Sequence, residues 1–387
     1  LMEPAGITGE IIEVAKKAVG NIRGGLAMVT ILACMIFAAL SGSGPATTAA
    51  IGSIMIPGMI GAGYRKDDAA AVAAMGSIMI PTMVRRGYSP EYAAGVCATG
   101  GTLGILIPPS NPMIIYGVVA NTSIAGLFMA GFIPGFVMTT SMCITAYCIA
   151  RKRGYKGTGE KFSVYGLLKA IWDGKWALAT PAIILGGIYA GIFTPTEAAV
   201  VAIFYTILVG IFIHKELTLK SFMASLKTTS WLTGRVLVLV FTATAFGYLL
   251  TSYRIPVEIA NWILSFTNNV NLVWFFVVIL LLFLGMFMET LAIIMLVTPV
   301  LLPIMTAYGV DPIHFGIILI CCCGIGFSTP PLGENMFIAS GIANVSLEEI
   351  SLKALPLVAI NIAVIAILVM FPDIVLFLPN LMGTGLQ

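Results

Sequence analysis

Charge is what this sequence has least of. Only 10% of its 387 residues are Asp, Glu, Lys or Arg, whereas 59% are hydrophobic, and the mean hydropathy is +1.03. An ordinary soluble domain carries about 25% charged residues, so a soluble globular fold is excluded because polar side chains are too few to cover its surface. We therefore expect an all-α polytopic membrane protein whose outer surface faces lipid.

Other absences limit the classes of function that are compatible with the sequence. No phosphate-binding P-loop occurs, so any pumping must use an ion gradient rather than ATP. The seven cysteines have no zinc or redox spacing, and we interpret them as small helix-packing residues. No cofactor is expected beyond a coupling ion. No signal peptide is visible, and because the chain opens with Leu1 and not with Met, we expect that an N-terminal part of the sequence is missing.

The few charges occur in clusters and leave long stretches without any. A membrane span needs about 20 apolar residues, so these stretches predict roughly nine to eleven membrane-crossing or re-entrant segments. The charge-free stretches are Gly24–Tyr64, Tyr92–Ala150, Trp176–Thr196, Val236–Tyr253, Ile259–Met288, Pro312–Gly333 and Ala354–Pro372.

The sequence contains an internal repeat. Glycines and prolines of the first half recur 222 residues later, and after one inserted residue the offset is 223. We therefore divide the chain into a first repeat (1–150), a connecting region (151–230) and a second repeat (231–387). The matching positions are Pro81 with Pro303, Gly87 with Gly309, Pro90 with Pro312, Gly104 with Gly326, Pro108-Pro109 with Pro330-Pro331, and residues 120–123 with 343–346.

Charge predicts that the two repeats have opposite orientations. The helix expected at Ile124–Ala150 is followed by Arg151, Lys152 and Arg153, which places that end in the cytoplasm by the positive-inside rule. The matching stretch Ala354–Pro372 is followed by Asp373 and by no Lys or Arg. Two similar halves of opposite orientation are typical of secondary transporters.

The connecting region begins with a loop, Arg151–Lys175, that has seven basic and two acidic residues. Spans are expected near Trp176–Thr194 and Ala198–Ile213, and His214–Ser230 has the pattern of an amphipathic helix on the membrane surface. A shorter tandem repeat, 52–75 and 76–99, also occurs, and we assign it no function.

Two segments, Gly100–Asn111 and Gly324–Asn335, have the composition of interrupted helices. Each has a proline four residues after a glycine, and proline leaves the carbonyl four residues before it without its helical partner. In lipid such broken backbone persists only around a cavity or an ion, although a simple proline kink in a packed helix is the alternative. The pairs are Gly104 with Pro108 and Gly326 with Pro330.

Hydroxyl groups accompany these carbonyls, and a hard cation such as Na⁺ prefers oxygen ligands. The sequence therefore predicts a sodium site that is shared between matched positions of the two repeats. Its candidate residues are Thr102, Gly104, Pro108, Gly326, Ser328, Thr329 and Pro330, with Ser110 supplying a further hydroxyl.

Polar residues in two further segments suggest contacts to a substrate. Residues 41–48 are small and polar, which fits either a binding site or tight helix packing. Glu289 is an ionisable side chain within an apolar stretch, which makes it a functional candidate. A helix break is expected at Ile255-Pro256, directly after Arg254. Arg254 offers a planar fork for a carboxylate, whereas the alternative for Arg254 and for Arg235 is snorkelling to the membrane surface.

Together these segments resemble the large membrane subunit of TRAP (tripartite ATP-independent periplasmic) transporters, and the resemblance covers essentially the whole chain. One departure is the tandem repeat, because the family pattern has a single GSIMIP-type segment. The matching pieces are SGSGPATTAA (41–50), GTLGILIPPSNPMIIYG (101–117), FTPTEAA (193–199), GMFMET (285–290) and GFSTPPLGENMF (326–337).

The resemblance implies an elevator-type fold with two re-entrant hairpins, sodium coupling, and location in the bacterial inner membrane. It also implies two partners, a small membrane subunit and a periplasmic substrate-binding protein. The implied substrate is a carboxylate, sialic acid or a C4-dicarboxylate, with a lean to sialic acid. The family's hairpin-tip residues correspond to Ser43, Ser110, Asn111, Glu289, Thr329 and Pro330. Of these, Ser43, Ser110, Asn111 and Glu289 form the predicted substrate site together with Arg254, which is chosen for its charge and not from the resemblance.

Three alternatives stay open. A transporter of the same superfamily could work without a binding protein. A pore would not need two broken hairpins in an inverted repeat. An intramembrane hydrolase with a nucleophilic serine in residues 41–44 would need a base, and His214 and His314 are the two histidines of the sequence.

Overall fold

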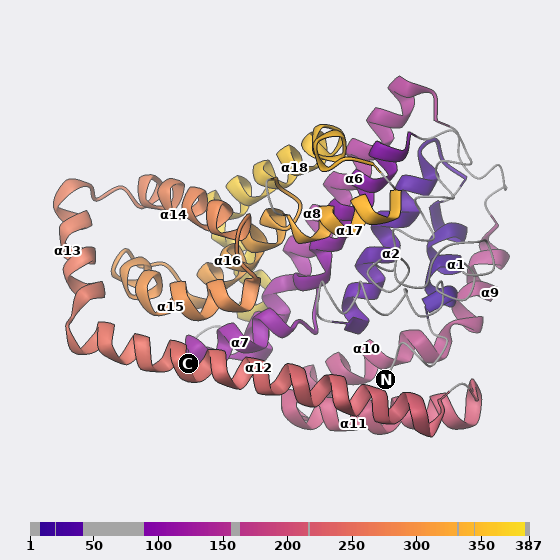
Figure 1. Ribbon diagram of the computed structural model, residues 1–387, viewed down its shortest axis with the longest axis horizontal. Helices are drawn as coiled ribbons and strands as arrows, with labels where there is room; N and C mark the ends of the chain where they lie inside the picture. The colour runs from indigo at the N-terminus through magenta and orange to yellow at the C-terminus, as the bar shows by residue number, and fades with distance from the viewer. Residues whose placement is uncertain are drawn as a thin grey trace.

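The computed structural model describes residues 8–19, 21–41, 89–155, 163–215, 217–330, 333–343 and 345–383, and within these ranges every regular element is a helix (Figure 1). The expected all-α class is therefore confirmed. The elements are α1 (Thr8–Val19), α2 (Gly25–Ser41), α6 (Pro90–Gly101), the 3₁₀ turn η2 (Thr102–Ile105), α7 (Asn111–Val119), α8 (Ile124–Arg153), α9 (Val164–Asp173), α10 (Lys175–Tyr189), α11 (Pro195–Leu208), the π turn η3 (Val209–Ile213), α12 (Leu219–Ser252), α13 (Ile255–Phe266), α14 (Val270–Gly285), α15 (Thr290–Ala307), α16 (Pro312–Gly326), α17 (Glu334–Ala343), α18 (Leu347–Met370) and α19 (Pro372–Leu381).

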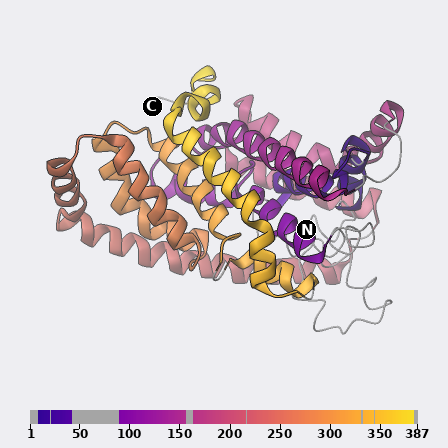
Figure 2. The same cartoon turned by 90° about the horizontal axis from the view of Figure 1, so that it is seen from above.

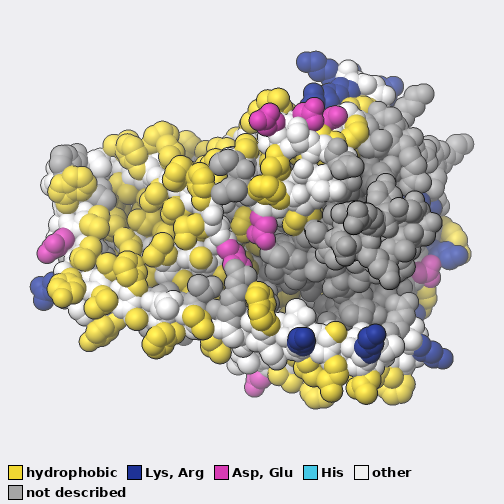
Figure 3. All heavy atoms as spheres, in the orientation of Figure 1, with side chains coloured by type: hydrophobic (Ala, Val, Ile, Leu, Met, Phe, Trp, Pro, Cys, Tyr) yellow, Lys and Arg dark blue, Asp and Glu magenta, His cyan; other side chains and the backbone are white. Residues whose placement is uncertain are grey.

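The helices have the lengths and surfaces that lipid requires. Among the described residues, four helical segments are long and apolar enough to cross a membrane: Ile124–Arg153, Pro195–Ile213, Thr290–Ala307 and Leu347–Met370. Large apolar side chains gather on the outside of the molecule over α13, α14 and α15 (Figure 3). An outer surface of this kind is stable against acyl chains and costly in water, which supports a multi-pass membrane protein.

The helices begin at equivalent positions in the two repeats. In the first repeat α6, α7 and α8 begin at residues 90, 111 and 124, and in the second α16, α17 and α18 begin at 312, 334 and 347. The offsets are 222, 223 and 223, as in the sequence. The two long helices are also capped alike, because Ser123 Oγ accepts from the Gly126 N–H at 3.1 Å and Ser346 Oγ from the Glu349 N–H at 3.4 Å.

Each repeat folds back on itself in the same way. The backbone N–H of Ser89, just before α6, lies 3.4 Å from the Tyr155 hydroxyl, just beyond the end of α8. In the second repeat, Nε2 of His314 at the start of α16 lies 3.0 Å from the carbonyl oxygen of Leu368 near the end of α18. The first hairpin helix of each repeat thus begins against the end of the long helix that follows, and α8 and α18 pack side by side (Figure 2).

The connecting region differs from the expectation at one place. Instead of a surface helix at His214–Ser230 followed by a separate span, α12 continues for 34 residues from Leu219 to Ser252. It is about 51 Å long at 1.5 Å per residue and runs along the lower edge of Figure 1 from α11 to α13. The sequence between the two expected elements contains no proline, so nothing breaks the helix there.

Residues 42–88 lie outside the described ranges. Ser43 and most of the tandem repeat lie there, so the role of Ser43 stays a prediction.

Candidate functional site

The broken segments of the two repeats meet in the middle of the molecule. After α6 and η2 the chain turns through residues 106–110 into α7, and residues 327–330 and 333 lie between α16 and α17. A Cβ atom built on Gly324 of α16 would lie 3.4 Å from the carbonyl oxygen of Thr102 and 3.2 Å from Ile105 Cδ1. The end of α16 therefore packs on η2, and the two turns are neighbours although more than 200 residues separate them.

All four predicted hydroxyls at these turns donate their proton to a backbone carbonyl. Ser110, Thr102 and Ser328 are buried, and Thr329 is partly buried. A hydroxyl that donates in this way keeps its oxygen lone pairs for another partner, so each is a potential cation ligand. The bonds run from Thr102 Oγ1 to Thr99 O (2.7 Å), Ser110 Oγ to Ile105 O (2.6 Å), Ser328 Oγ to Ala98 O (2.8 Å) and Thr329 Oγ1 to Ile325 O (2.8 Å).

The carbonyl of Ala98 joins the two hairpins. It accepts from Ser328 Oγ at 2.8 Å and from Asn335 Nδ2 at 3.1 Å. Gly101, one turn further along, leaves room for this amide, because a Cβ there would lie 2.9 Å from Asn335 Nδ2. Sequence reasoning missed Asn335 as a site residue, although it ends the second broken segment and is a polar side chain within an apolar stretch, which is a usable signal.

Two glycines bring the backbones of α14 and α16 into contact. A Cβ on Gly326 would lie 2.4 Å from the carbonyl carbon of Gly285, and a Cβ on Gly285 would lie 3.2 Å from Gly326 Cα. Only residues without a Cβ fit this approach at the end of α16. The segment 285–290 therefore lies directly beside the second hairpin turn.

The prediction that Pro330 leaves the carbonyl of Gly326 without a hydrogen-bond donor is wrong. Its carbonyl is not released by Pro330, because it accepts the Thr329 N–H at 3.0 Å. The helices end before the prolines, α16 at Gly326 and η2 at Ile105, since a residue that precedes proline disfavours the helical conformation. A carbonyl oxygen has two lone pairs, so the carbonyl of Gly326 keeps one acceptor position.

Glu289 occupies the N-cap position of α15 and is half-buried. The next residue, Thr290, is 3% exposed, and its hydroxyl makes no hydrogen bond to any described residue. Because a buried hydroxyl without a partner is costly, Thr290 is a candidate for contact with a bound molecule or ion that sequence reasoning did not select. α15 also packs against α7, which begins with the predicted residue Asn111; Asn111 is exposed.

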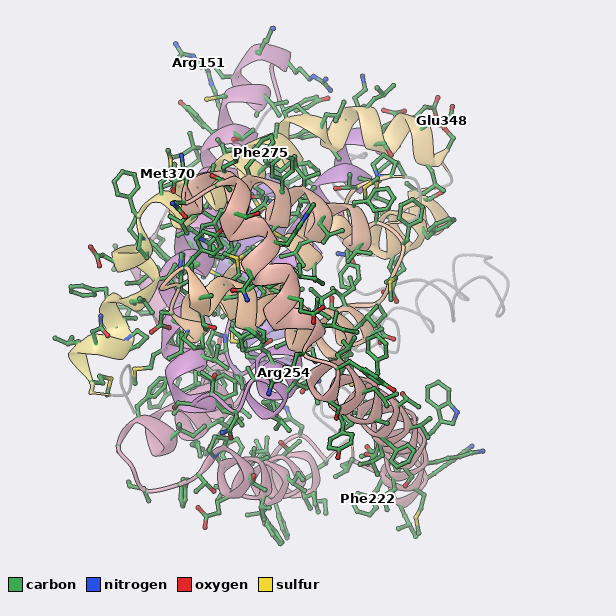
Figure 4. All side chains as sticks on the ribbon, turned by 90° about the vertical axis from the view of Figure 1, so that its left-hand side faces the viewer. Arg151, Phe222, Arg254, Phe275, Glu348 and Met370 are labelled. Atoms are coloured by element: carbon green, nitrogen blue, oxygen red, sulfur yellow. The ribbon has the colours of Figure 1, made fainter. Side chains whose placement is uncertain are left out.

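Arg254 does not lie with the other predicted site residues. It sits with a φ of 54° on the turn between α12 and α13, where the helix break was predicted, and its side chain is exposed. Figure 1 places this turn at the left-hand edge of the molecule, away from α16 and α17 (Figure 4 labels Arg254 in the view from that side). This position favours the alternative of interfacial snorkelling. The side chain of Arg235 lies outside the described residues.

We expect Arg254→Lys to keep near-wild-type uptake, because either cation can reach the membrane surface. Uptake into proteoliposomes at equal protein amounts measures this. A loss of tenfold or more would instead show that the planar guanidinium binds an anion, as the sequence-based hypothesis holds.

Known proteins resemble the chain along nearly its whole length. The sequence model of the family described as tripartite ATP-independent periplasmic transporter, DctM component, matches residues 1–74 and 68–374. The two matches overlap within the first copy of the tandem repeat, which fits a chain that carries one more copy of this segment than the family has.

Individual relatives agree. The chain is 42% identical over 376 residues to an isethionate TRAP transporter permease of Oleidesulfovibrio alaskensis, covering 97% of this chain and 55% of that protein. It is 36% identical to a sialic acid TRAP transporter large permease of Vibrio cholerae, covering 100% and 84%. It is 37% identical to a C4-dicarboxylate TRAP transporter large permease of Pseudomonas aeruginosa, covering 99% and 84%. The chain thus spans about half of the first relative and most of the other two.

Proposed function

Since this chain belongs to the family of the DctM component of tripartite ATP-independent periplasmic transporters, we propose that it moves a small organic acid across the membrane by sodium-coupled secondary transport. Its relatives are transport permeases and not enzymes, so the hydrolase alternative is set aside. The chain is a multi-pass protein of the bacterial inner membrane.

The sodium site is proposed at the meeting point of the two hairpin turns. The observation that supports it best is the group of hydroxyls whose protons are held by backbone carbonyls, which leaves oxygen lone pairs for a cation. A hard cation prefers oxygen ligands of this kind. The proposed ligands come from Thr102, Gly104, Pro108, Gly326, Ser328, Thr329 and Pro330, and Ser110 at the first turn supplies a further hydroxyl.

The substrate is proposed to be an organic anion that binds beside this cation. The relatives are named for isethionate, sialic acid and C4-dicarboxylates, which share a negative charge on a small polar molecule. Our proposal keeps sialic acid or a C4-dicarboxylate as the substrate. The proposed contacts are Ser43, Ser110, Asn111 and Glu289. Thr290 is added to them because its buried hydroxyl makes no hydrogen bond to any described residue.

Elevator movement of an inverted repeat is the proposed mechanism. It is supported by the equivalent helix positions of the two halves and by the contacts of the second hairpin with α6 and η2 of the first, which is the arrangement expected of a site at the repeat interface. The word tripartite in the family description supports two partners, a small membrane subunit and a periplasmic substrate-binding protein.

Uptake into proteoliposomes tests the proposal directly. The complex with its small subunit should accumulate a labelled acid only when an inward Na⁺ gradient and the loaded binding protein are both present. Replacing Na⁺ with choline should reduce accumulation to the level of empty vesicles. Flux without a gradient would indicate a pore, and full uptake without the binding protein would indicate a simpler transporter of the same superfamily.

Ser110→Ala and Thr329→Ala should each raise the Na⁺ concentration for half-maximal uptake, because each removes one oxygen ligand from a charged ion. A single bond to a charged group corresponds to about a tenfold change. Uptake measured across a series of Na⁺ concentrations gives this value, while the amount of purified protein should stay the same.

Thr145→Ala is the matched control. Thr145 makes the same kind of bond, from Oγ1 to the carbonyl of Ser141 at 2.9 Å, but it lies on α8 away from both turns. If the two site variants change the sodium dependence no more than Thr145→Ala does, the proposed ligands are wrong.

Cysteines at Asn111 and Glu334 should be labelled from opposite sides of the membrane. These two exposed positions begin α7 and α17 and are equivalent at the offset of 223. An impermeant thiol reagent, applied to oriented vesicles in one ligand state, measures access after the exposed native Cys148 has been replaced by serine. Labelling of both from the same side would contradict the inverted arrangement.

A further inference from the structure

A groove lies between α9 and α10, outside the site described above. It has a volume of about 720 Å³ and opens to the outside of the molecule. Apart from two lysines, the side chains around it are apolar or aromatic. The lining residues are Tyr165, Leu168, Lys169, Ile171, Trp172, Lys175, Leu178 and Ala179.

The helix α9 has two different faces, one packed against the protein and one exposed. One side packs on α1, while the other leaves Leu168 60% exposed and Trp172 68% exposed. Tyr and Trp beside exposed leucines are typical of a helix that lies in the interface between water and acyl chains. This face is therefore suited to the headgroup region of a bilayer.

The two lysines hold positive charge at the groove. Lys175 Nζ lies 4.1 Å from the ring centroid of Trp172 and 5.4 Å from that of Trp176, so the aromatic rings keep the ammonium in place. Lys169 lines the same groove. Asp173 is the acidic residue of α9 and α10 and does not line the groove, so the lining carries a net positive charge.

The position of α9 in the chain indicates which leaflet of the membrane the groove faces. α9 follows the exposed basic end of α8, Arg151–Arg153, which faces the cytoplasm by the positive-inside rule. The cytoplasmic leaflet is the one whose anionic lipids attract basic protein segments. The groove thus combines an apolar floor, two ammonium groups and access from this leaflet.

We propose that the groove between α9 and α10 is a binding site for an anionic phospholipid. The ammonium groups of Lys169 and Lys175 bind the phosphate of the headgroup, and the acyl chains lie along Leu178 and Ala179 on α10. An apolar ligand alone would leave two charges without a partner, and a free phosphate would leave the apolar floor uncovered.

Contact quenching of tryptophan tests the proposal. The transporter complex is reconstituted in phosphatidylcholine vesicles that contain a minor fraction of phosphatidylglycerol with brominated acyl chains, and brominated phosphatidylcholine serves as the comparison. Phosphatidylglycerol should quench Trp172 and Trp176 at a lower mole fraction than phosphatidylcholine does. Lys169→Gln with Lys175→Gln should reduce this preference by about fivefold for each lysine removed.

Lys220→Gln with Lys227→Gln is the matched control, since both lysines are exposed on α12 and neither lines the groove. It should leave the preference unchanged. Quenching by brominated phosphatidylcholine should be equal in all variants, which shows that they are folded and inserted. The proposal fails if the two lipids quench equally, if the control pair has the same effect, or if the small membrane subunit excludes the lipid from the groove.

Discussion

Gly326→Ala is expected to reduce sodium-driven uptake by at least tenfold and to lower the thermal stability of the purified protein. The added Cβ would lie 2.4 Å from the Gly285 carbonyl carbon, a distance that forces α14 and α16 apart. Overpacking of a well-packed contact costs about 1–3 kcal/mol, and more where backbone must move. Uptake per folded protein and the melting temperature in detergent measure the two effects.

A graded series separates this contact from a general intolerance of alanine. Gly285→Ala should have a smaller effect, because its Cβ would approach Gly326 Cα only to 3.2 Å. Gly186→Ala on α10 should be neutral or stabilising, because no atom lies within 4 Å of its added Cβ. Equal effects of Gly326→Ala and Gly186→Ala would rule out the proposed backbone contact.

Asn335→Asp is expected to abolish uptake almost completely. The substitution replaces the Nδ2 donor, 3.1 Å from the Ala98 carbonyl oxygen, with a carboxylate oxygen that repels it. The side chain is 8% exposed, and a buried charge without a partner costs several kcal/mol. Uptake at saturating Na⁺ and substrate measures the effect.

Two variants show whether the donor or the added charge matters. Asn335→Ala should be milder, because the Ala98 carbonyl keeps its bond from Ser328. Asn271→Asp places the same change on an exposed residue at the start of α14 and should leave uptake unchanged. Wild-type uptake by Asn335→Asp would show that the contact with Ala98 has no part in transport.

Local sequence chemistry accounts for where several of the helices begin and end. Both first hairpin helices begin at a proline, Pro90 and Pro312, because proline is favoured in the first turn of a helix. The break expected at Ile255-Pro256 is confirmed, because α12 ends at Ser252 and α13 begins at Ile255. These features depend on a few neighbouring residues and are therefore readable from one sequence.

Contacts between the repeats were not readable in the same way. Asn335 and Ala98 are separated by 237 positions, and no local pattern predicts that the amide of one reaches the carbonyl of the other. Arg254 is the opposite case, a residue that was predicted to lie in a site. Its charge suggested that it binds an anion, but the fold places it on an exposed turn. The length of α12 was missed because a basic, amphipathic start is compatible with both a surface helix and the beginning of a longer one.

The shared carbonyl of Ala98 makes the two halves thermodynamically dependent on each other. Its hydrogen bonds with Ser328 and Asn335 would lengthen if one hairpin turn moved without the other, so the turns should shift as one body. If an ion binds at the proposed site and tightens one turn, we expect it to raise the affinity of the other turn for its own ligand, and by reciprocity that ligand would raise the affinity for the ion by the same factor. Cooperative loading would in this way arise from one backbone oxygen, without a separate signalling element.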